Sequence, residues 1–124
     1  MSHTLAYLGG ATIFAWGVAH LIPTRSVMAG FGPLSAENSR ILTMEWVAEG
    51  LTLCFIGVLA ALVARHAGGG GAAVTIVLRS CAGMLVAMAV LSGFTGARTS
   101  VLPMKLCPLV KATVAGMFIA ATMA

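Results

Sequence analysis

Two glutamates stand inside a segment that is otherwise apolar enough to cross a membrane. Glu45 and Glu49 lie within residues 43–58, TMEWVAEGLTLCFIGV, and the chain has only three acidic residues in all. Because they are four positions apart, the two carboxylates share one face of a helix. Ionisable groups at membrane depth are rare and usually face the bundle interior or a water-filled cavity. This pair is therefore the first candidate for function, as proton acceptors or as ligands of a cation.

Other polar side chains should converge on the same half of the protein. His20 ends the first apolar segment, and Lys111 lies about 12 Å along the last one if that helix starts at Pro103. Antiparallel helices would place both near the depth of Glu49. We expect a polar pocket there, with Arg98 as a further countercharge. The predicted catalytic residues for proton transfer are His20, Glu45 and Glu49, and the predicted ligand-binding residues are Trp16, His20, Trp46, Glu49 and Lys111.

The same residues also permit a purely structural interpretation. Glu49 would pair with Lys111 and Glu45 with His20, in an internal network that satisfies its own charges and fixes the register of the helices. The sequence leaves the functional and the structural interpretation open.

Metal and cofactor chemistry has little support in the sequence. No Glu is followed by a His three positions later, which is the spacing of di-iron helical bundles. A lone His20 is more often a hydrogen-bonded packing residue than a haem ligand. The cysteines, Cys54, Cys81 and Cys107, are far apart, which argues against a zinc site or a disulfide framework. No metal is predicted, and the cofactor is left unassigned.

Composition indicates that membrane helices position these residues. Hydrophobic residues make up 60% of the chain, charged residues make up 8%, and the mean hydropathy is +1.04. Soluble domains have about 45–50% apolar and about 25% charged residues. We predict an all-α fold, an integral membrane up-down-up-down bundle of four transmembrane helices, as a single domain over residues 1–124. The predicted spans are residues 4–22, 38–65, 73–94 and 104–124, joined by a loop at 23–40, a glycine run at 68–71 and a polar turn at 95–103.

The distribution of basic residues predicts an orientation. Five of the seven basic residues belong to one face and two to the other. The first face has Arg25, Arg40, Arg98 and Lys105, with Lys111 just inside the last span, and the second has Arg65 and Arg79. The positive-inside rule places the first and third connections in the cytoplasm and both termini outside, in an inner or plasma membrane. No basic cluster indicates a nucleic-acid partner, and none is predicted.

A recognisable order of residues runs through the first half of the chain. Gly17 and His20 close the first span and Phe31 follows in the loop. Farther on, Glu45, Glu49, Gly50, Leu53 and Gly57 lie along EWVAEGLTLCFIG. Over residues 9–65 this order resembles the DoxX-like superfamily of small four-helix membrane proteins. The resemblance implies an accessory or ligand-binding subunit around a lipophilic small molecule or a partner membrane protein. The chain departs from the family in its second glutamate, in His20 where a basic residue is common, and in lacking a redox cysteine pair.

Two other functions stay open. One is a membrane-embedded enzyme in which His20, Glu45 and Glu49 transfer protons on a quinone- or isoprenoid-like substrate. The other is a small proton- or cation-coupled transporter. Residues 7–11, YLGGA, resemble the start of small multidrug resistance transporters, but those carry an essential acid near the place of Ala15. The predicted partners are the lipid bilayer, a lipophilic small molecule, and partner membrane subunits or further copies of the chain.

Overall fold

Four long helices and one short helix make up the fold. The computed structural model describes residues 2–66 and 71–124, and within these ranges it contains no strand. The helices are α1 (His3–Leu21), α2 (Thr24–Gly30), α3 (Ala36–His66), α4 (Ala72–Phe94) and α5 (Leu102–Met123), with a 3₁₀ turn η1 (Gly96–Arg98) after α4. The regions of α1, α3, α4 with η1, and α5 are each long and apolar enough to cross a membrane. The all-α prediction with four candidate spans is confirmed.

The spans begin and end within two residues of the predicted limits, but the first connection differs from the predicted loop. Residues 24–30 form the helix α2. Pro23 ends α1 because it has no N–H with which to continue the helical hydrogen bonds. The next long helix, α3, begins at Ala36, directly after Ser35, whose hydroxyl accepts a hydrogen bond from the Asn38 N–H at 3.1 Å, as an N-cap does. Helix α2 has no buried residue, so no hydrophobic period identified it in the sequence.

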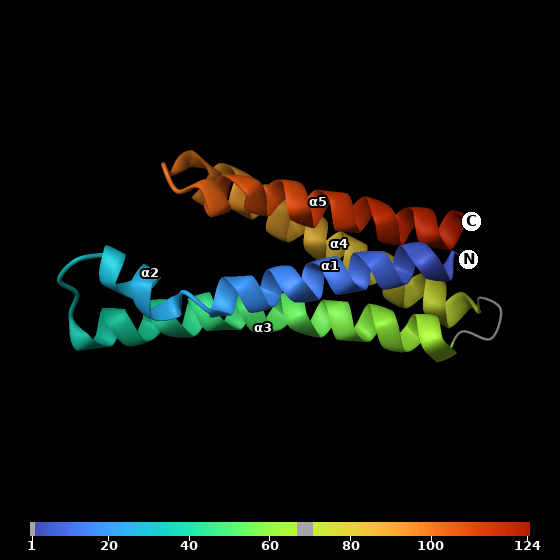
Figure 1. The fold of residues 1–124 in the computed structure, drawn as a ribbon, viewed down its shortest axis with the longest axis horizontal. Helices are drawn as coiled ribbons and strands as arrows, with labels where there is room; N and C mark the ends of the chain where they lie inside the picture. The colour runs from blue at the N-terminus through green and yellow to red at the C-terminus, as the bar shows by residue number, and fades with distance from the viewer. Residues whose placement is uncertain (1, 67–70) are drawn as a thin grey trace.

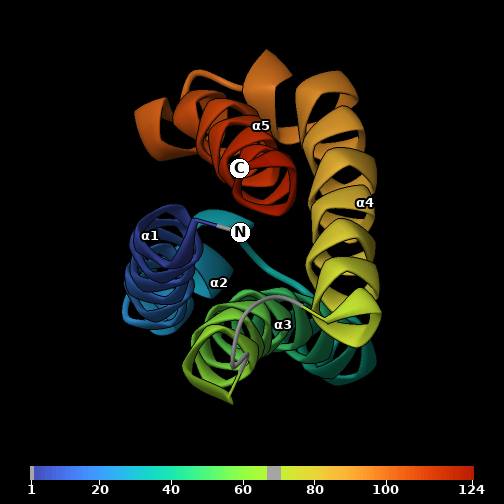
Figure 2. The same ribbon diagram turned by 90° about the vertical axis from the view of Figure 1, so that its right-hand side faces the viewer.

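The bundle has two ends, one that contains both chain termini and one that contains α2. Figure 1 shows the N- and C-termini together at one end, with α2 and the α4–α5 connection at the opposite end. Figure 2, viewed from the terminal end, shows α1 beside α3 and α4 beside α5. These two pairs have the most extensive contacts, α1 also packs on α5, and contact between α3 and α4 is sparse. The separation of α3 from α4 leaves room for the site described below.

Glycines bring α1 and α3 into close contact. A methyl group on Gly10 would lie 2.9 Å from the carbonyl oxygen of Gly57, and one on Gly17 would lie 2.9 Å from that of Gly50. The two glycines of α1, Gly10 and Gly17, are seven residues apart. Their partners on α3, Gly57 and Gly50, are also seven residues apart but follow in the opposite chain direction. Small residues at such positions allow helix backbones to approach closely in a membrane. The antiparallel register that they fix brings the end of α1 to the part of α3 that contains Trp46.

Apolar side chains fill the centre of the bundle and also cover its outside. The buried core draws on all four long helices and includes Ile13, Leu53, Leu85 and Phe118. Large apolar side chains are exposed as well, for example Ile22, Phe55, Ile76, Leu91 and Leu109. Four apolar helices with such an outer surface indicate a multi-pass protein embedded in a membrane.

Candidate functional site

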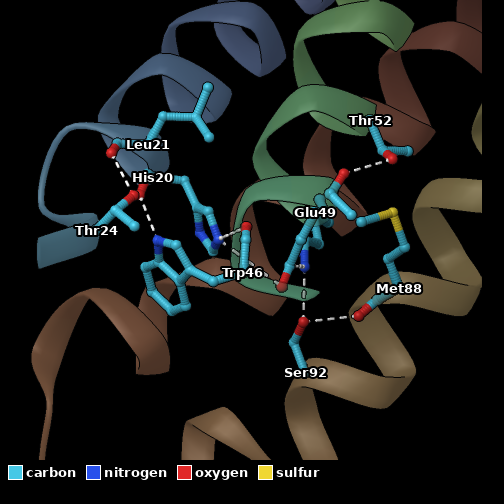
Figure 3. Close-up of polar contacts among 10 residues, drawn as sticks. His20, Leu21, Thr24, Trp46, Glu49, Thr52, Met88 and Ser92 are labelled. Carbon is cyan, nitrogen blue, oxygen red and sulfur yellow. Dashed lines mark hydrogen bonds and ion pairs between the residues drawn. The ribbon is translucent and has the colours of Figure 1, made fainter. Parts of the chain in front are cut away.

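Lys111 is the one charged side chain among the described residues that is fully buried. Its Nζ donates hydrogen bonds to Oε1 of Glu49 and, at 2.7 Å, to Oγ of Ser92. The Ser92 hydroxyl in turn donates to the Met88 carbonyl oxygen at 2.7 Å. Figure 3 shows this chain of contacts, which links α5 to α3 and α4. A buried charge is stabilised only when it is paired and hydrogen-bonded, and Lys111 meets both conditions.

Helix direction explains why Lys111 and Glu49 meet. Side chains on an α-helix tilt towards its N-terminus. The N-termini of α3 and α5 both lie towards the α2 end of the molecule (Figure 1), so both side chains extend towards that end. Ser92 is three residues from Thr95, where α4 is capped, and therefore lies at the same end. The ion pair and its serine partner thus occupy the half of the bundle nearest to α2.

His20 lies on the other side of Glu49. Its Nε2 is 3.1 Å from the Trp46 carbonyl oxygen and 4.0 Å from Oε2 of Glu49. A carbonyl oxygen only accepts hydrogen bonds, so Nε2 carries the hydrogen and donates it. The side chain of His20 is 7% exposed, whereas that of Glu49 is 33% exposed. Glu49 is therefore held by Lys111 through one oxygen and faces His20 with the other, while part of the side chain stays accessible.

The end of α1 is fastened by two side chains. The Trp46 indole N–H donates to the His20 carbonyl oxygen at 3.0 Å, and the Thr24 hydroxyl donates to the Leu21 carbonyl oxygen at 2.6 Å. These carbonyls belong to the last turn of the helix, where no backbone N–H partner follows. The His20 and Trp46 rings also stack, with centroids 3.8 Å apart and planes 16° from parallel. The position of His20 is therefore fixed through its backbone, its ring face and its Nε2.

A cavity of about 470 Å³ opens beside the ion pair. We call it the acidic cavity, because it contains two of the three acidic residues of the chain. It lies between α3 and α4, and Met28 of α2 and the buried Lys111 of α5 also line it. Its lining is otherwise mostly apolar. The lining residues are Met28, Phe31, Leu42, Glu45, Trp46, Ala48, Glu49, Thr52, Met84, Met88, Leu91, Ser92 and Lys111.

A second cavity, of about 430 Å³, lies on the other side of Trp46. We call it the His20 cavity. It is bounded by the end of α1, by Val27 of α2 and by the first turns of α5. Its lining residues are Trp16, Ala19, His20, Pro23, Val27, Trp46, Val101, Leu102, Pro103, Met104, Leu106 and Cys107. Trp46 lines both cavities and separates them.

The predicted site residues divide between these two cavities. The structure brings His20, Trp46, Glu49 and Lys111 into one connected group, whereas Trp16 lines only the His20 cavity. Glu45 is exposed and lines the acidic cavity. The structure does not contain the Glu45–His20 pair of the structural interpretation, because His20 lies near Glu49 instead.

Arg98 does not act as a countercharge to these carboxylates within the described part of the chain. Its guanidinium carbon lies 5.4 Å from the centre of the Phe94 ring, a cation–π distance. The other two histidines are also engaged elsewhere. His3 Nδ1 is 2.9 Å from the Ala64 carbonyl oxygen, and His66 Nδ1 is 2.9 Å from that of Leu62.

Sequence reasoning did not identify Ser92 or the His20–Trp46 stack. Ser92 had a usable signal, since it is a hydroxyl near the end of the third span, close in depth to the polar residues of the neighbouring helices. No sequence signal indicated the His20–Trp46 stack, because the stack depends on how α1 and α3 are rotated about their own axes. Trp46 was expected as a ligand-binding residue, but its hydrogen bond to the end of α1 was not foreseen.

Within residues 2–66 and 71–124, no group of three or more His, Cys, Asp or Glu side chains could hold a metal ion. The site instead offers a carboxylate, a fixed ammonium group and an imidazole beside apolar space. No protein-family model, curated protein or solved structure matches the chain.

Proposed function

We propose that this chain is an integral membrane protein that binds a lipophilic small molecule in the acidic cavity. The observation that carries the proposal is the pairing of a partly exposed Glu49 with a fully buried Lys111 in the lining of a mostly apolar cavity. Ligand cavities in proteins are about 300–1,000 Å³, mostly apolar, with a few fixed polar groups. The cavity of about 470 Å³ falls in this range.

The two carboxylate oxygens of Glu49 differ in their partners, and this difference supports binding at this site. Lys111 occupies Oε1, whereas Oε2 lies 4.0 Å from Nε2 of His20. A hydrogen bond between nitrogen and oxygen is about 2.7–3.2 Å long, so Oε2 is free to accept one from a ligand. Lys111 and Ser92 hold the carboxylate in place, which reduces the cost of ordering it when a ligand binds.

As part of the same proposal, the four helices form an up-down-up-down bundle of the DoxX-like kind in an inner or plasma membrane. The connections 23–40 and 95–103 face the cytoplasm, and the termini lie outside. The acidic cavity then belongs to the cytoplasmic half of the bundle. In this setting the protein acts as an accessory or ligand-binding subunit, alone or with partner membrane proteins. The glycine contacts between α1 and α3 and the excess of basic residues around the first and third connections support this arrangement.

The enzyme and transporter alternatives use the same residues. In the enzyme alternative, His20, Glu45 and Glu49 would transfer protons on a bound substrate, directly or through one bridging water. The hydrogen on His20 Nε2 is already donated to the Trp46 carbonyl oxygen, which favours binding over acid–base catalysis by His20. Transport would require the cavity to open alternately to both sides of the membrane. Uptake that follows a proton gradient would favour it over binding alone.

Native mass spectrometry of protein purified in a mild detergent tests the proposal. The wild type is compared with Ala48→Phe, which places a phenyl ring at the wall of the acidic cavity, and with Ala112→Phe. Ala112 is exposed on α5 and lines neither described cavity. We expect a bound small molecule in the wild type and in Ala112→Phe, and a reduced amount in Ala48→Phe. A ligand-free wild type, or equal occupancy in all three proteins, would contradict the proposal.

A further inference from the structure

The acidic cavity has an excess of negative charge. Its charged lining residues are Glu45, Glu49 and Lys111, two carboxylates and one ammonium group, which gives a formal charge of −1. Lys111 is fully buried and bound to Glu49, so these two charges largely neutralise each other. The remaining charge belongs to Glu45.

Glu45 stands where a ligand could reach it. It lies one helical turn before Glu49 on α3, is exposed, and lines the same cavity. Neither of the ion pairs found among the described residues includes it. Its charge is therefore available to a ligand.

The remaining lining is suited to an organic cation rather than to a hydrated metal ion. Hard metal ions need about six or more oxygen ligands, and no cluster of three or more ligating side chains occurs within the described ranges. The cavity wall instead contains Met28, Met84 and Met88, together with Phe31 and Trp46. Thioether and aromatic side chains are polarisable and make favourable contacts with apolar groups and with cations of diffuse charge.

We infer that the ligand of the acidic cavity is a lipophilic organic cation, such as a hydrophobic amine or a quaternary onium ion. This inference rests on the proposed function and specifies the ligand class. The apolar groups of the cation lie between α3 and α4, against the methionines. Its charge lies between Glu45 and Oε2 of Glu49, the two acceptors that Lys111 leaves free.

Three probes of similar shape and different charge provide the test. They are tetraphenylphosphonium (positive), tetraphenylborate (negative) and tetraphenylsilane (neutral), each titrated into protein in a neutral detergent, with protein-free micelles subtracted. The chain has two tryptophans. A Trp16→Phe background therefore makes Trp46, which lines the cavity, the only source of indole fluorescence. We expect tetraphenylphosphonium to bind at least tenfold more tightly than the neutral probe, and tetraphenylborate to bind more weakly than both.

Glu45→Gln in the same background removes the unpaired charge and leaves the Glu49–Lys111 pair in place. It should weaken tetraphenylphosphonium binding about tenfold and leave the affinity of the neutral probe unchanged. Glu37→Gln is the matched control, because Glu37 is an exposed glutamate in the first turn of α3 that does not line the cavity.

The outcomes separate this inference from the proposed function. Equal binding of all three probes would overturn the cation inference and leave the lipophilic site intact. A cation preference that survives in Glu45→Gln, or that is lost equally in Glu37→Gln, would also overturn the inference. No binding of any probe would contradict both the inference and the proposed function.

Discussion

Trp46 and His20, 26 positions apart in the sequence, are joined by two reciprocal hydrogen bonds and a ring stack. The Trp46 indole N–H donates to the His20 carbonyl oxygen at 3.0 Å, and His20 Nε2 donates to the Trp46 carbonyl oxygen at 3.1 Å. The rings stack at 3.8 Å. One pair of residues thus fixes the end of α1 on α3, and its Trp46 lines both cavities. The loss of either bond should therefore affect both stability and binding.

Trp46→Phe removes the indole N–H but keeps an aromatic ring to stack on His20. The His20 carbonyl oxygen then lacks its donor at the end of α1. We expect the free energy of unfolding to fall by about 1 kcal/mol, a typical value for one hydrogen bond. Denaturant titration in mixed micelles, followed by circular dichroism, measures the change. Trp16→Phe is the control, because no side-chain hydrogen bond of Trp16 occurs in the described structure, and an equal loss in the control would contradict the assignment.

Glu49→Gln should be more destabilising than Lys111→Met. The first change leaves the fully buried Lys111 ammonium without its anion, and breaking a buried ion pair from one side costs about 3–5 kcal/mol. The second leaves Glu49, whose side chain is 33% exposed and can be solvated through the cavity. The same denaturant titration gives both values.

The double variant of these two residues tests whether the ion pair itself is the cause. Replacing both members of a buried pair by uncharged groups is often neutral or stabilising. Glu49→Gln with Lys111→Met should therefore recover at least half of the stability lost in Glu49→Gln alone. Additive losses would mean that the two side chains contribute independently of each other.

Gly57→Ala should weaken the packing of α1 on α3. The added methyl carbon would lie 2.6 Å from the Gly10 carbonyl oxygen and 2.7 Å from the Phe14 Cβ, so the two helices would have to move apart. We expect a loss of about 1–3 kcal/mol, as in other overpacked interiors. Gly83→Ala on α4 is the control, since an added methyl group there meets nothing within 4 Å. It should be neutral or stabilising by up to about 1 kcal/mol. If both variants are equally stable, the close contact at Gly57 is not important for packing.

The sequence was sufficient to predict the spans, because their limits follow from hydropathy and from helix-ending residues. Pro23 follows the last turn of α1, and Ser35 directly precedes α3. Depth along a helix could also be estimated, since each residue adds about 1.5 Å. That estimate put Lys111 near Glu49, and the structure contains this contact.

Rotation about the helix axes could not be predicted in the same way. Glu45 and Glu49 share a face of α3, so either could have been placed next to His20. The close packing of Gly50 and Gly17 determines which glutamate lies next to His20, because it brings the last turn of α1 against Trp46 and Glu49. The division into two cavities was unforeseen for the same reason, since it depends on the position of the Trp46 ring.

The orientation of the bundle gives a last prediction. Arg25, Arg40, Arg98 and Lys105 are all exposed and belong to the α2 end of the molecule (Figure 1), and basic residues near the ends of spans are retained in the cytoplasm. A C-terminal alkaline phosphatase fusion in a bacterial host should therefore be active, and a C-terminal green fluorescent protein fusion should be dark. The matched pair of fusions after residue 100, in the third connection, should give the opposite result. If the C-terminal fusions are instead fluorescent and inactive as phosphatase, the acidic cavity belongs to the external half of the membrane, and its ligand would enter from outside the cell.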